Sequence, residues 1–481
     1  MKFQMGEFSE QDYNYAKSLG ISAEALNNQW QRFKNGFERI LLNRAATIGD
    51  GIVQLSAEES KKYIQLFEQE KNNYSILKFV PSSGAASRMF LPFLDMIEHP
   101  TSDNSKRLIH FLSSFSFYAD ILEKAIEKGL DINELKEDPI ALAHFILNKE
   151  GLDYDNYPKG LISFTRDKGK SKNAFELHLD EAKSISGGLI HFTVAEDYLD
   201  EIREKINDEN ASYSIQDSST HFISVYRNKA IRDDSGQLLF RPSGHGALLK
   251  NLNELDADIV FIKNIDNIQQ ASKNKLSIEV KKMLGGYLMA IKNQIDTFLF
   301  QLEEDENCDT LEISAWIREH LDPRFAPAKK DELIAFLHRP LRVAGMVLNE
   351  GKAGGGPFWV KNKKGIQLQI VENAQIDKSD SEQLKILASS THFNPVDIVC
   401  SLIDHRGEKF DLEDYVDKES GFLTKKVVNG VEAMTMERPG LWNASMANWL
   451  SIFIEIPLAS FTPVKDVLDL LPAEKKQMIK S

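Results

Sequence analysis

The sequence Phe79-Val-Pro-Ser-Ser-Gly-Ala-Ala-Ser-Arg-Met-Phe90 joins an apolar run to a loop of small residues that ends in an arginine. Residues 76–80 predict a short buried strand, and residues 89–98 predict a helix. A strand that leads through small residues into a helix lets backbone N–H groups converge on an anion, and Arg88 adds a charged fork for phosphate oxygens. Walker A and G-x-G-x-x-G patterns are not present in this loop, so a tight connection without ligand is the alternative interpretation.

The composition is that of an ordinary globular protein. The chain has 481 residues, 42% of them hydrophobic and 27% charged. This length accommodates one large domain with insertions or two to three domains. The net charge of −14 argues against a nucleic-acid partner, which favours a basic surface, but leaves small phosphorylated substrates open.

Cysteine content and hydropathy indicate the compartment. Cys308 and Cys400 are the only cysteines, which excludes a disulfide scaffold and fits a reducing cytoplasm. The first residues, MKFQMGEFSEQD, contain no apolar segment of the secretory type, and no uncharged apolar run approaches the roughly 20 residues that span a membrane. We therefore expect a cytoplasmic protein without a membrane partner.

Three regions have helical patterning. Residues 1–72 are expected to form a helical N-terminal cap, because Trp30, Phe33, Phe37, Ile40 and Leu41 recur at helical spacing. Residues 91–150 and 271–338 are expected to be helical insertions. They would interrupt an α/β domain that spans residues 73–481.

The remaining sequence alternates between strands and helices. Strands are predicted at residues 161–164, 189–194, 221–225, 258–262, 343–348, 366–371 and 453–456, with helices at 174–186 and 197–206. This alternation predicts a three-layer α/β/α fold with a mostly parallel, mixed sheet. Ligands of such sheets bind beyond the carboxyl ends of the strands, which places the Gly84 loop and residues 264–267 at the same edge.

Three further motifs carry polar groups suited to phosphate chemistry. Tyr157-Pro-Lys-Gly-Leu161 places Lys159 before a strand, where it would either bind a phosphate or be a solvated turn lysine. Arg241-Pro-Ser-Gly-His-Gly-Ala-Leu-Leu249 brackets His245 with two glycines, which permit close backbone approach to a ring or phosphate or simply form a turn. An apolar strand leads to Asp266 in the segment Asp258-Ile-Val-Phe-Ile-Lys-Asn-Ile-Asp-Asn267. Asp266 would either bind Mg²⁺ or form part of a turn.

The order of these motifs resembles that of the UDP-sugar pyrophosphorylases, nucleotidyltransferases of the GT-A type. Their Gly-x-Gly-Thr-Arg loop is similar to Gly84-Ala-Ala-Ser-Arg88, with Ala86 in place of the second glycine. Residues 158–160 are similar to their Pro-Lys-Gly motif, and residues 242–248 to their Pro-x-Gly-Asn-Gly-Gly-Leu motif. Residues 266–267 are similar to their strand-terminal Asp-Asn, and residues 461–466 to their Phe-x-Pro-Val-Lys-Asn motif. The chain also resembles an uncharacterised bacterial family distantly related to these enzymes.

The resemblance implies a reaction and a set of site residues. An NTP, with UTP expected, and a sugar 1-phosphate would give a nucleotide sugar and pyrophosphate, with Mg²⁺ as cofactor bound by Asp266. The implied catalytic residues are Arg88, Lys159 and Lys465. The implied substrate-binding residues are Ser83, Gly84, Ala85, Ala86, Ser87, Pro242, Gly244, His245, Gly246 and Glu372.

Departures from the family pattern leave two alternatives open. His245 replaces the family's asparagine, Ala247 replaces a glycine, and the Val-Glu-Tyr-Ser-Glu motif is reduced to Val371-Glu372 without its tyrosine. A protein that binds a sugar nucleotide without turnover is therefore one alternative. A glycosyltransferase on the same fold is the other, although Asn264-Ile-Asp266 has only one acid of the Asp-x-Asp motif such enzymes commonly use.

Overall fold

The computed structural model of the protein describes residues 7–167, 169–269, 274–351, 355–362, 365–428, 430–438 and 440–480. The chain forms two compact units, each built from three stretches that are separated in the sequence. Unit 1 contains Met1–Ile76, Gln216–Phe261 and Lys282–Pro457, and unit 2 contains Leu77–Ile215, Ile262–Lys281 and Leu458–Ser481. The boundary expected from the sequence at residues 72 and 73, between a cap and an α/β domain, stays a prediction.

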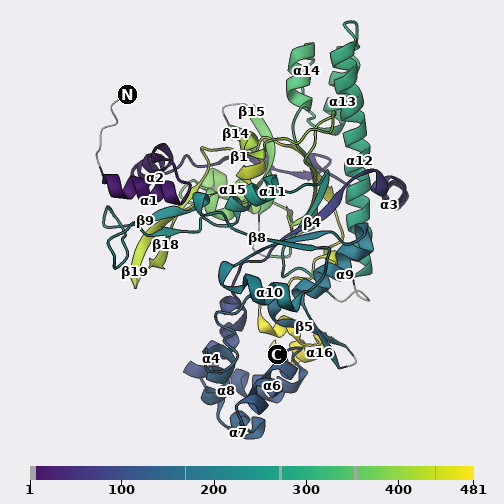
Figure 1. Cartoon of the computed structure of the whole chain (residues 1–481). Helices are drawn as coiled ribbons and strands as arrows, with labels where there is room; N and C mark the ends of the chain where they lie inside the picture. Colours follow the sequence, from purple (N-terminus) through teal and green to yellow (C-terminus); the bar gives the residue numbers. More distant parts are fainter. Residues whose placement is uncertain are drawn as a thin grey trace. The chain divides into compact units, whose positions relative to one another are not determined.

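Unit 2 is built on parallel strands. β4 (Ile76–Pro81) lies parallel to β7 (Ile190–Val194), which lies parallel to β8 (Ala211–Ile215). All five side chains of β7 are buried, as expected for a strand covered on both faces. α10 (Leu199–Lys205) connects β7 to β8 in a βαβ unit, and α9 (Ala174–Ser186) precedes β7 (Figure 1). β12 (Ile259–Lys263) enters unit 2 with its last two residues and leads to Asp266.

The bounds of α9 follow from its local sequence. Asn173 accepts the N–H of Glu176 while the Glu176 carboxylate accepts the N–H of Asn173, which is a capping box. Gly187 follows the last helical residue with φ of +86°, a left-handed conformation that glycine adopts without strain. The helix predicted for residues 174–186 is therefore confirmed at both ends.

A group of short helices forms a second layer of unit 2. These are α4 (Leu91–Glu98), α5 (Asp103–His110), α6 (Tyr118–Glu127), α7 (Ile132–Glu137) and α8 (Pro139–Leu147), which gather together in Figure 1. α16 (Ala473–Lys480) packs on α5, where Arg107 donates to the carbonyl of Ile479. The aromatic rings of Phe90, Phe117 and Tyr154 contact one another in the hydrophobic core of this unit. The helical patterning predicted for residues 91–150 is confirmed.

Unit 1 has its own largely parallel strands. β13 (Leu341–Leu348) lies parallel to β20 (Leu450–Glu455), which lies parallel to β3 (Gly51–Val53), and β3 lies parallel to β2 (Thr47–Ile48). β17 (Asp397–Ser401) and β16 (His392–Phe393) pair with β13 in the antiparallel direction. The central sheet is thus mixed but mostly parallel, which confirms the predicted fold class.

Two antiparallel sheets complete the strands of unit 1. β1 (Leu41–Ala45), β14 (Gly356–Asn362) and β15 (Gly365–Val371) form one of them. The other consists of β9 (Phe222–Tyr226), β10 (Lys229–Ala230), β11 (Phe240–Arg241), β18 (Phe422–Val428) and β19 (Val431–Glu437). α1 (Glu10–Ser18) and α2 (Ala23–Asn35) bury Trp30 against Ile223 and Val225 of β9.

The other helices of unit 1 are α3 (Ala57–Glu70), α11 (Leu249–Asn253), α13 (Thr310–His320), α14 (Lys330–Leu337) and α15 (Ser381–Ala388). The long α12 (Lys275–Glu304) continues in this unit from Lys282. Phe298 of α12 packs edge-on against Trp316 of α13. The helical patterning predicted for residues 271–338 is confirmed from Lys275 onward, and residues 271–273 lie outside the described residues.

Three sequence-based assignments differ from the structure. Residues 41–53 of the predicted helical cap form β1 to β3, because Gly36, with φ of +72°, ends α2 before the spaced positions Phe37, Ile40 and Leu41. The strand expected at residues 161–164 begins at Ser163 and, within the described parts of the chain, pairs with β6 (Lys170–Asn173) alone. The strand at 221–225 lies in an antiparallel sheet. The sequence could not predict this, because the alternation of apolar residues does not specify the direction of the neighbouring strands.

Among the described residues, no helix combines the length and the apolar character that crossing a membrane requires.

A buried carboxylate connects the elements of unit 2 that lead to the predicted site. Glu181 of α9 pairs with Lys78 of β4, with Lys263 of β12 at 3.5 Å and with Lys281 of α12 at 3.2 Å. All four side chains are at most 3% exposed. Burial raises the pKa of Glu181, but the three lysines outweigh this effect and hold the pKa well below its ordinary value. The carboxylate therefore stays charged and acts as the common partner of three ammonium groups.

We expect Glu181→Ala to lower the free energy of unfolding by about 3–5 kcal/mol, because it leaves buried ammonium groups without their carboxylate. Urea unfolding followed by circular dichroism measures this change. Glu204→Ala, on the exposed part of α10, is the control and should change the free energy by less than about 0.5 kcal/mol. Equal changes in the two variants would contradict the proposed role of Glu181.

Candidate functional site

The loop after β4 is held in place by backbone hydrogen bonds within unit 2. The N–H of Ala86 donates to the carbonyl of Tyr157 at 3.0 Å, and the N–H of Lys159 donates to the carbonyl of Gly84 at 3.1 Å. The hydroxyl of Ser87 donates to the carbonyl of Asp155 at 2.6 Å. The first two predicted motifs, which are about 70 positions apart in the sequence, are thus one local structure.

The outer side of this loop is open. Ser83, Gly84 and Ala85 are exposed, and a Cβ added to Gly84 would meet no atom within 4 Å. Arg88 is also exposed, on a single 3₁₀ turn (Ser87–Phe90), and its guanidinium makes no hydrogen bond or ion pair with any described residue. Exposed backbone next to a permanently charged guanidinium is an arrangement that can accept a phosphate.

Asp266 is the centre of a three-residue charge cluster in unit 2. Its Oδ2 atom lies 3.0 Å from Nζ of Lys159 and 3.1 Å from Nζ of Lys465. The side chains of Asp266 and Lys159 are each 14% exposed, whereas that of Lys465 is 61% exposed. Burial lowers the pKa of the Lys159 ammonium group, and the attraction of Asp266 opposes this shift.

Backbone contacts fix the segments that carry the cluster. The N–H of Val464 donates to the carbonyl of Asp266 at 2.8 Å, which places Lys465 beside the end of β12. The N–H of Lys465 in turn donates to Oδ2 of Asp469 at 2.7 Å. On the other side, Nε2 of the buried His178 donates to the carbonyl of Ile265 at 3.1 Å. The position of Asp266 is thus set by neighbours from two different elements.

The Asp266 carboxylate also fits one ligand position of a Mg²⁺ ion. Its Oδ1 atom is buried and has no hydrogen-bond partner among the described residues, while Oδ2 accepts both lysines. Oδ1 of the adjacent Asn267 accepts the N–H of Thr462 at 3.1 Å. Mg²⁺ commonly takes one or two protein oxygens and completes its shell with phosphates and water, so a single carboxylate oxygen is sufficient.

A second cluster lies in unit 1, around His245. Its Nδ1 accepts the N–H of Leu441 at 3.1 Å, so a neutral ring carries its proton on Nε2, which lies 3.7 Å from Oε1 of Glu372. One face of the ring stacks on Trp442, with the ring centroids 4.4 Å apart. Both nitrogens and one face of His245 are therefore engaged by the protein, which favours a positioning role over acid–base catalysis.

Glu372 and two glycines shape the surroundings of His245. Asn443 donates from Nδ2 to Oε1 of Glu372 at 2.5 Å. Burial raises the pKa of Glu372, but the contacts with His245 and Asn443 outweigh this and lower it overall. Gly244 has φ of +83°, which favours glycine, and its backbone lies near Glu437, since an added Cβ would be 3.3 Å from Oε2.

The structure groups the sequence-predicted residues within two separate units. Lys159, Asp266 and Lys465 are in direct contact in unit 2, and the loop that carries Arg88 is hydrogen-bonded to the Lys159 segment. Of the residues in unit 1, His245 and Glu372 are in contact, Gly244 and the buried Gly246 flank His245, and Pro242 is exposed. The functional roles of all these residues stay predictions.

Sequence reasoning missed the contacts that Leu441, Trp442 and Asn443 make with His245 and Glu372, and the close packing of Gly440 against His245. They belong to a short connection between β19 and β20 that has no recognisable periodicity. The stretch Gly440-Leu-Trp-Asn443, in which an aromatic residue and an amide follow a glycine and a leucine, was the available signal. Sequence spacing alone could not link it to His245, because the two lie 196 positions apart.

Each unit also has a cleft away from its predicted cluster. Unit 1 has one of about 410 Å³ that is bordered by Phe325, Arg339 and Trp449, and unit 2 has one of about 450 Å³ that is bordered by Asp120, Tyr157 and Lys205. None of the predicted site residues lines either cleft.

Comparisons with known proteins identify the fold. A family model described as "Domain of unknown function (DUF4301)" matches residues 9–476, and no curated protein matches the chain. The UDP-N-acetylglucosamine pyrophosphorylase from Trypanosoma brucei is similar over 96% of this chain and 79% of that chain, with a TM-score of 0.50 and 12% identity. A UDP-glucose phosphorylase from Trypanosoma brucei is also 12% identical, with coverage of 95% of this chain and 77% of that chain and a TM-score of 0.46. A UDP-glucose pyrophosphorylase from Leishmania major is 12% identical as well, with coverage of 95% of this chain and 77% of that chain and a TM-score of 0.45. The predicted resemblance to the fold of UDP-sugar pyrophosphorylases is confirmed.

The packing of Gly440 gives a test of the His245 cluster. A Cβ at this position would overlap Cε1 of His245 and lie 2.9 Å from both Nδ2 of Asn443 and Oε1 of Glu372. We expect Gly440→Ala to lower the free energy of unfolding by about 1–3 kcal/mol, because His245 is held by its stacking and cannot move freely.

Thermal and urea unfolding measure this effect, with Gly84→Ala as the matched control. The added Cβ at Gly84 meets no atom within 4 Å, so the control should keep the stability of the natural protein. If Gly440→Ala is as stable as Gly84→Ala, the contacts around His245 are looser than the structure indicates.

Proposed function

Because the chain belongs to the family described as a domain of unknown function (DUF4301), we propose its activity from the chemistry of its own residues. The proposed reaction joins an NTP, with UTP expected, to a sugar 1-phosphate and releases pyrophosphate. The observation that carries this proposal is the pairing of one carboxylate, Asp266, with two ammonium groups, Lys159 and Lys465, next to the exposed Gly84 loop.

Such a transfer requires the protein to align the two substrates and to neutralise their phosphates, and it does not require a nucleophilic side chain. A phosphate oxygen of the sugar phosphate attacks the α-phosphorus of the NTP, the bond from the α-phosphorus to the bridging oxygen breaks, and pyrophosphate leaves with that oxygen. Negative charge accumulates on the phosphates during this step, so fixed cations lower the barrier. Lysine and arginine side chains of unit 2 supply such cations.

We assign a role to each residue of unit 2. Arg88 and the exposed residues Ser83–Ala85 of the Ser83–Ser87 loop hold the β- and γ-phosphates, Lys159 offsets charge on the triphosphate, and Lys465 holds the sugar phosphate. Asp266 keeps both lysines in place and offers Oδ1 to Mg²⁺, which when bound supplies additional charge neutralisation at the phosphates.

We assign recognition of the nucleotide sugar to unit 1. In this role the backbone of Gly244 and Gly246 contacts the base, and Pro242, His245 and Glu372 shape the surface around it. The stacking of His245 on Trp442 supports this assignment, because it gives the two glycines a rigid neighbour.

A second function, binding of a sugar nucleotide without turnover, is favoured by one observation. Oδ2 of Asp266 is already neutralised by Lys159 and Lys465, so the cluster can hold a phosphate group without any reaction. The two functions differ in their products and not in their ligands.

We expect Asp266→Ala and Lys465→Ala each to reduce pyrophosphate release by about 10²- to 10³-fold, because the first removes the group that holds both lysines and offers an oxygen to Mg²⁺, and the second removes a cation that holds the sugar phosphate. The assay pairs a panel of NTPs with a panel of sugar 1-phosphates and measures pyrophosphate release. Lys170→Ala, an exposed lysine of the same unit, is the control for a general loss of charge and should keep full activity. Near-natural turnover in either site variant would exclude this mechanism.

Ligand binding separates the two functions. We expect a matching NTP with Mg²⁺ to raise the stability of the folded protein, by about 2.7 kcal/mol at a ligand concentration 100 times the Kd. Thermal-shift measurements with NTPs and sugar nucleotides, with and without Mg²⁺, record this. Asp266→Asn should remove the dependence on Mg²⁺ and keep the shift that nucleotide alone causes. A stabilising ligand without pyrophosphate release from any pair would support binding without turnover.

A further inference from the structure

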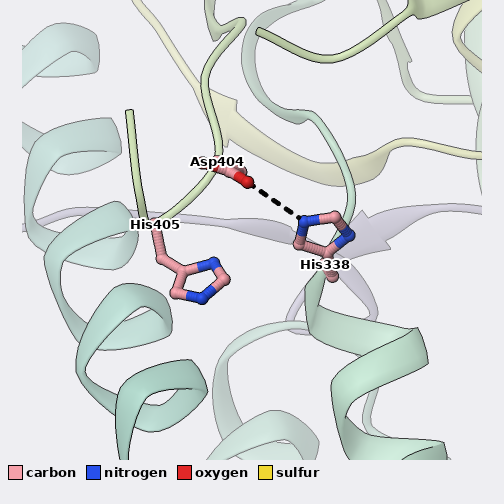
Figure 2. A group of neighbouring side chains, drawn as sticks. All are labelled: His338, Asp404 and His405. Carbon is pink, nitrogen blue, oxygen red and sulfur yellow. Dashed lines mark hydrogen bonds and ion pairs between the residues drawn. The ribbon is translucent and has the colours of Figure 1, made fainter. Parts of the chain in front are cut away.

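We propose that His338, Asp404 and His405 of unit 1 bind a divalent transition-metal ion of the zinc class. One ligand atom from each of the three residues lies within 4.8 Å of the others. Figure 2 shows their side chains grouped around a common point, with Nε2 of His338 facing the Asp404 carboxylate. The three residues are outside both clusters described above, so the proposal does not depend on the proposed transferase activity.

The local backbone presents Asp404 as a ligand. Its Oδ1 atom accepts the N–H of Arg406 at 2.8 Å and the N–H of Glu408 at 2.9 Å, within the turn that follows β17. Oδ2 therefore remains available and lies 3.3 Å from Nε2 of His338, the residue that ends α14. The carboxylate is 12% exposed.

Of the three residues, His405 has the surroundings most typical of a metal ligand. Its side chain is 2% exposed, and its Nε2 atom lies 3.0 Å from Oε2 of Glu303 on α12. A proton on Nε2 that is donated to Glu303 leaves Nδ1 with a lone pair, and this buried atom has no hydrogen-bond partner among the described residues. A carboxylate on one nitrogen and a free lone pair on the other is how metal-binding histidines are commonly held.

The spacing of His338 and Asp404 agrees with a tetrahedral ion. Ligand atoms about 2.0–2.2 Å from a tetrahedral Zn²⁺ are roughly 3.4 Å apart. The pair His338 and Asp404 already has this spacing, at 3.3 Å. The side chain of His338 is 41% exposed, so it can adjust toward the buried His405 and leave a fourth position for water. Two imidazole nitrogens and one carboxylate oxygen favour Zn²⁺ or Co²⁺ over Mg²⁺ and Ca²⁺.

The neighbouring side chains are compatible with an added cation. Lys292 donates to the backbone carbonyl of Asp404 at 3.0 Å, but its charge is balanced by Asp296 at 2.6 Å. The charge of Arg406 is balanced by Glu303 at 2.7 Å. Aromatic rings of Phe300 and Phe410 pack edge-on against His405 and His338, respectively, and place apolar surface beside both imidazoles.

The test is metal titration of the full-length chain after treatment with EDTA. We expect one equivalent of Zn²⁺ to compete with a chromogenic chelator, and Co²⁺ to give the visible absorption of a tetrahedral complex. His338→Ala and Asp404→Asn should each weaken Zn²⁺ binding at least about 100-fold, and Glu303→Gln, which removes the carboxylate shared by His405 and Arg406 but no metal ligand, should weaken it by about 10- to 100-fold.

His320→Gln is the matched control, because His320 also lies near a glutamate, at 3.9 Å, but has no third ligand in its surroundings among the described residues. It should leave Zn²⁺ binding unchanged. Because His338 is partly exposed and Asp404→Asn preserves size, both variants should fold, which circular dichroism verifies. The proposal is overturned if no equivalent of Zn²⁺ binds, or if binding persists undiminished in both ligand variants.

Discussion

The ion cluster around Glu181 is the constraint on which the arrangement of unit 2 depends. One buried carboxylate is shared by Lys78 of β4, Lys263 of β12 and Lys281 of α12, so the strands that carry the predicted site are tied to α9 by charge as well as by apolar packing. Such a buried cluster tolerates little displacement, because moving any member leaves a charge without its partner in a medium that solvates it poorly. The ends of β4 and β12 are therefore well-defined anchors for the Gly84 loop and for Asp266.

Beyond these anchors, the site is assembled by backbone hydrogen bonds that join distant stretches. The carbonyl of Gly84 receives the N–H of Lys159, and the carbonyl of Asp266 receives the N–H of Val464, so two lysines reach the same carboxylate from opposite directions in the sequence. In this arrangement the negative charge of Asp266 holds the two ammonium groups next to each other. Phosphates that bind here would compete with the carboxylate for the lysines, which couples ligand binding to a rearrangement of the exposed Lys465.

The sequence was informative where a pattern is local. The apolar run before Gly84, the capping residue Asn173 and the terminating Gly187 each act within a few positions, and the corresponding elements β4 and α9 were predicted closely. Pairing direction was not predictable, because the alternation of β9 suits either direction. In the candidate site, charged motifs were visible one by one, but the stacking of His245 on Trp442 and the convergence of two lysines on Asp266 arise only from tertiary contacts.

The division of each unit among three separate stretches has a consequence for how the protein is made. Asp266 and its two lysines lie in three different stretches of unit 2, and Lys465 belongs to the last, Leu458–Ser481. During synthesis on the ribosome, Lys159 and Asp266 emerge and can pair while residues 458–481 have not yet been translated. Completion of the charge cluster is consequently a late event in biogenesis, and it depends on contacts of high sequence separation, which form slowly. Any chain released before this point would carry the first two residues of the cluster without the third.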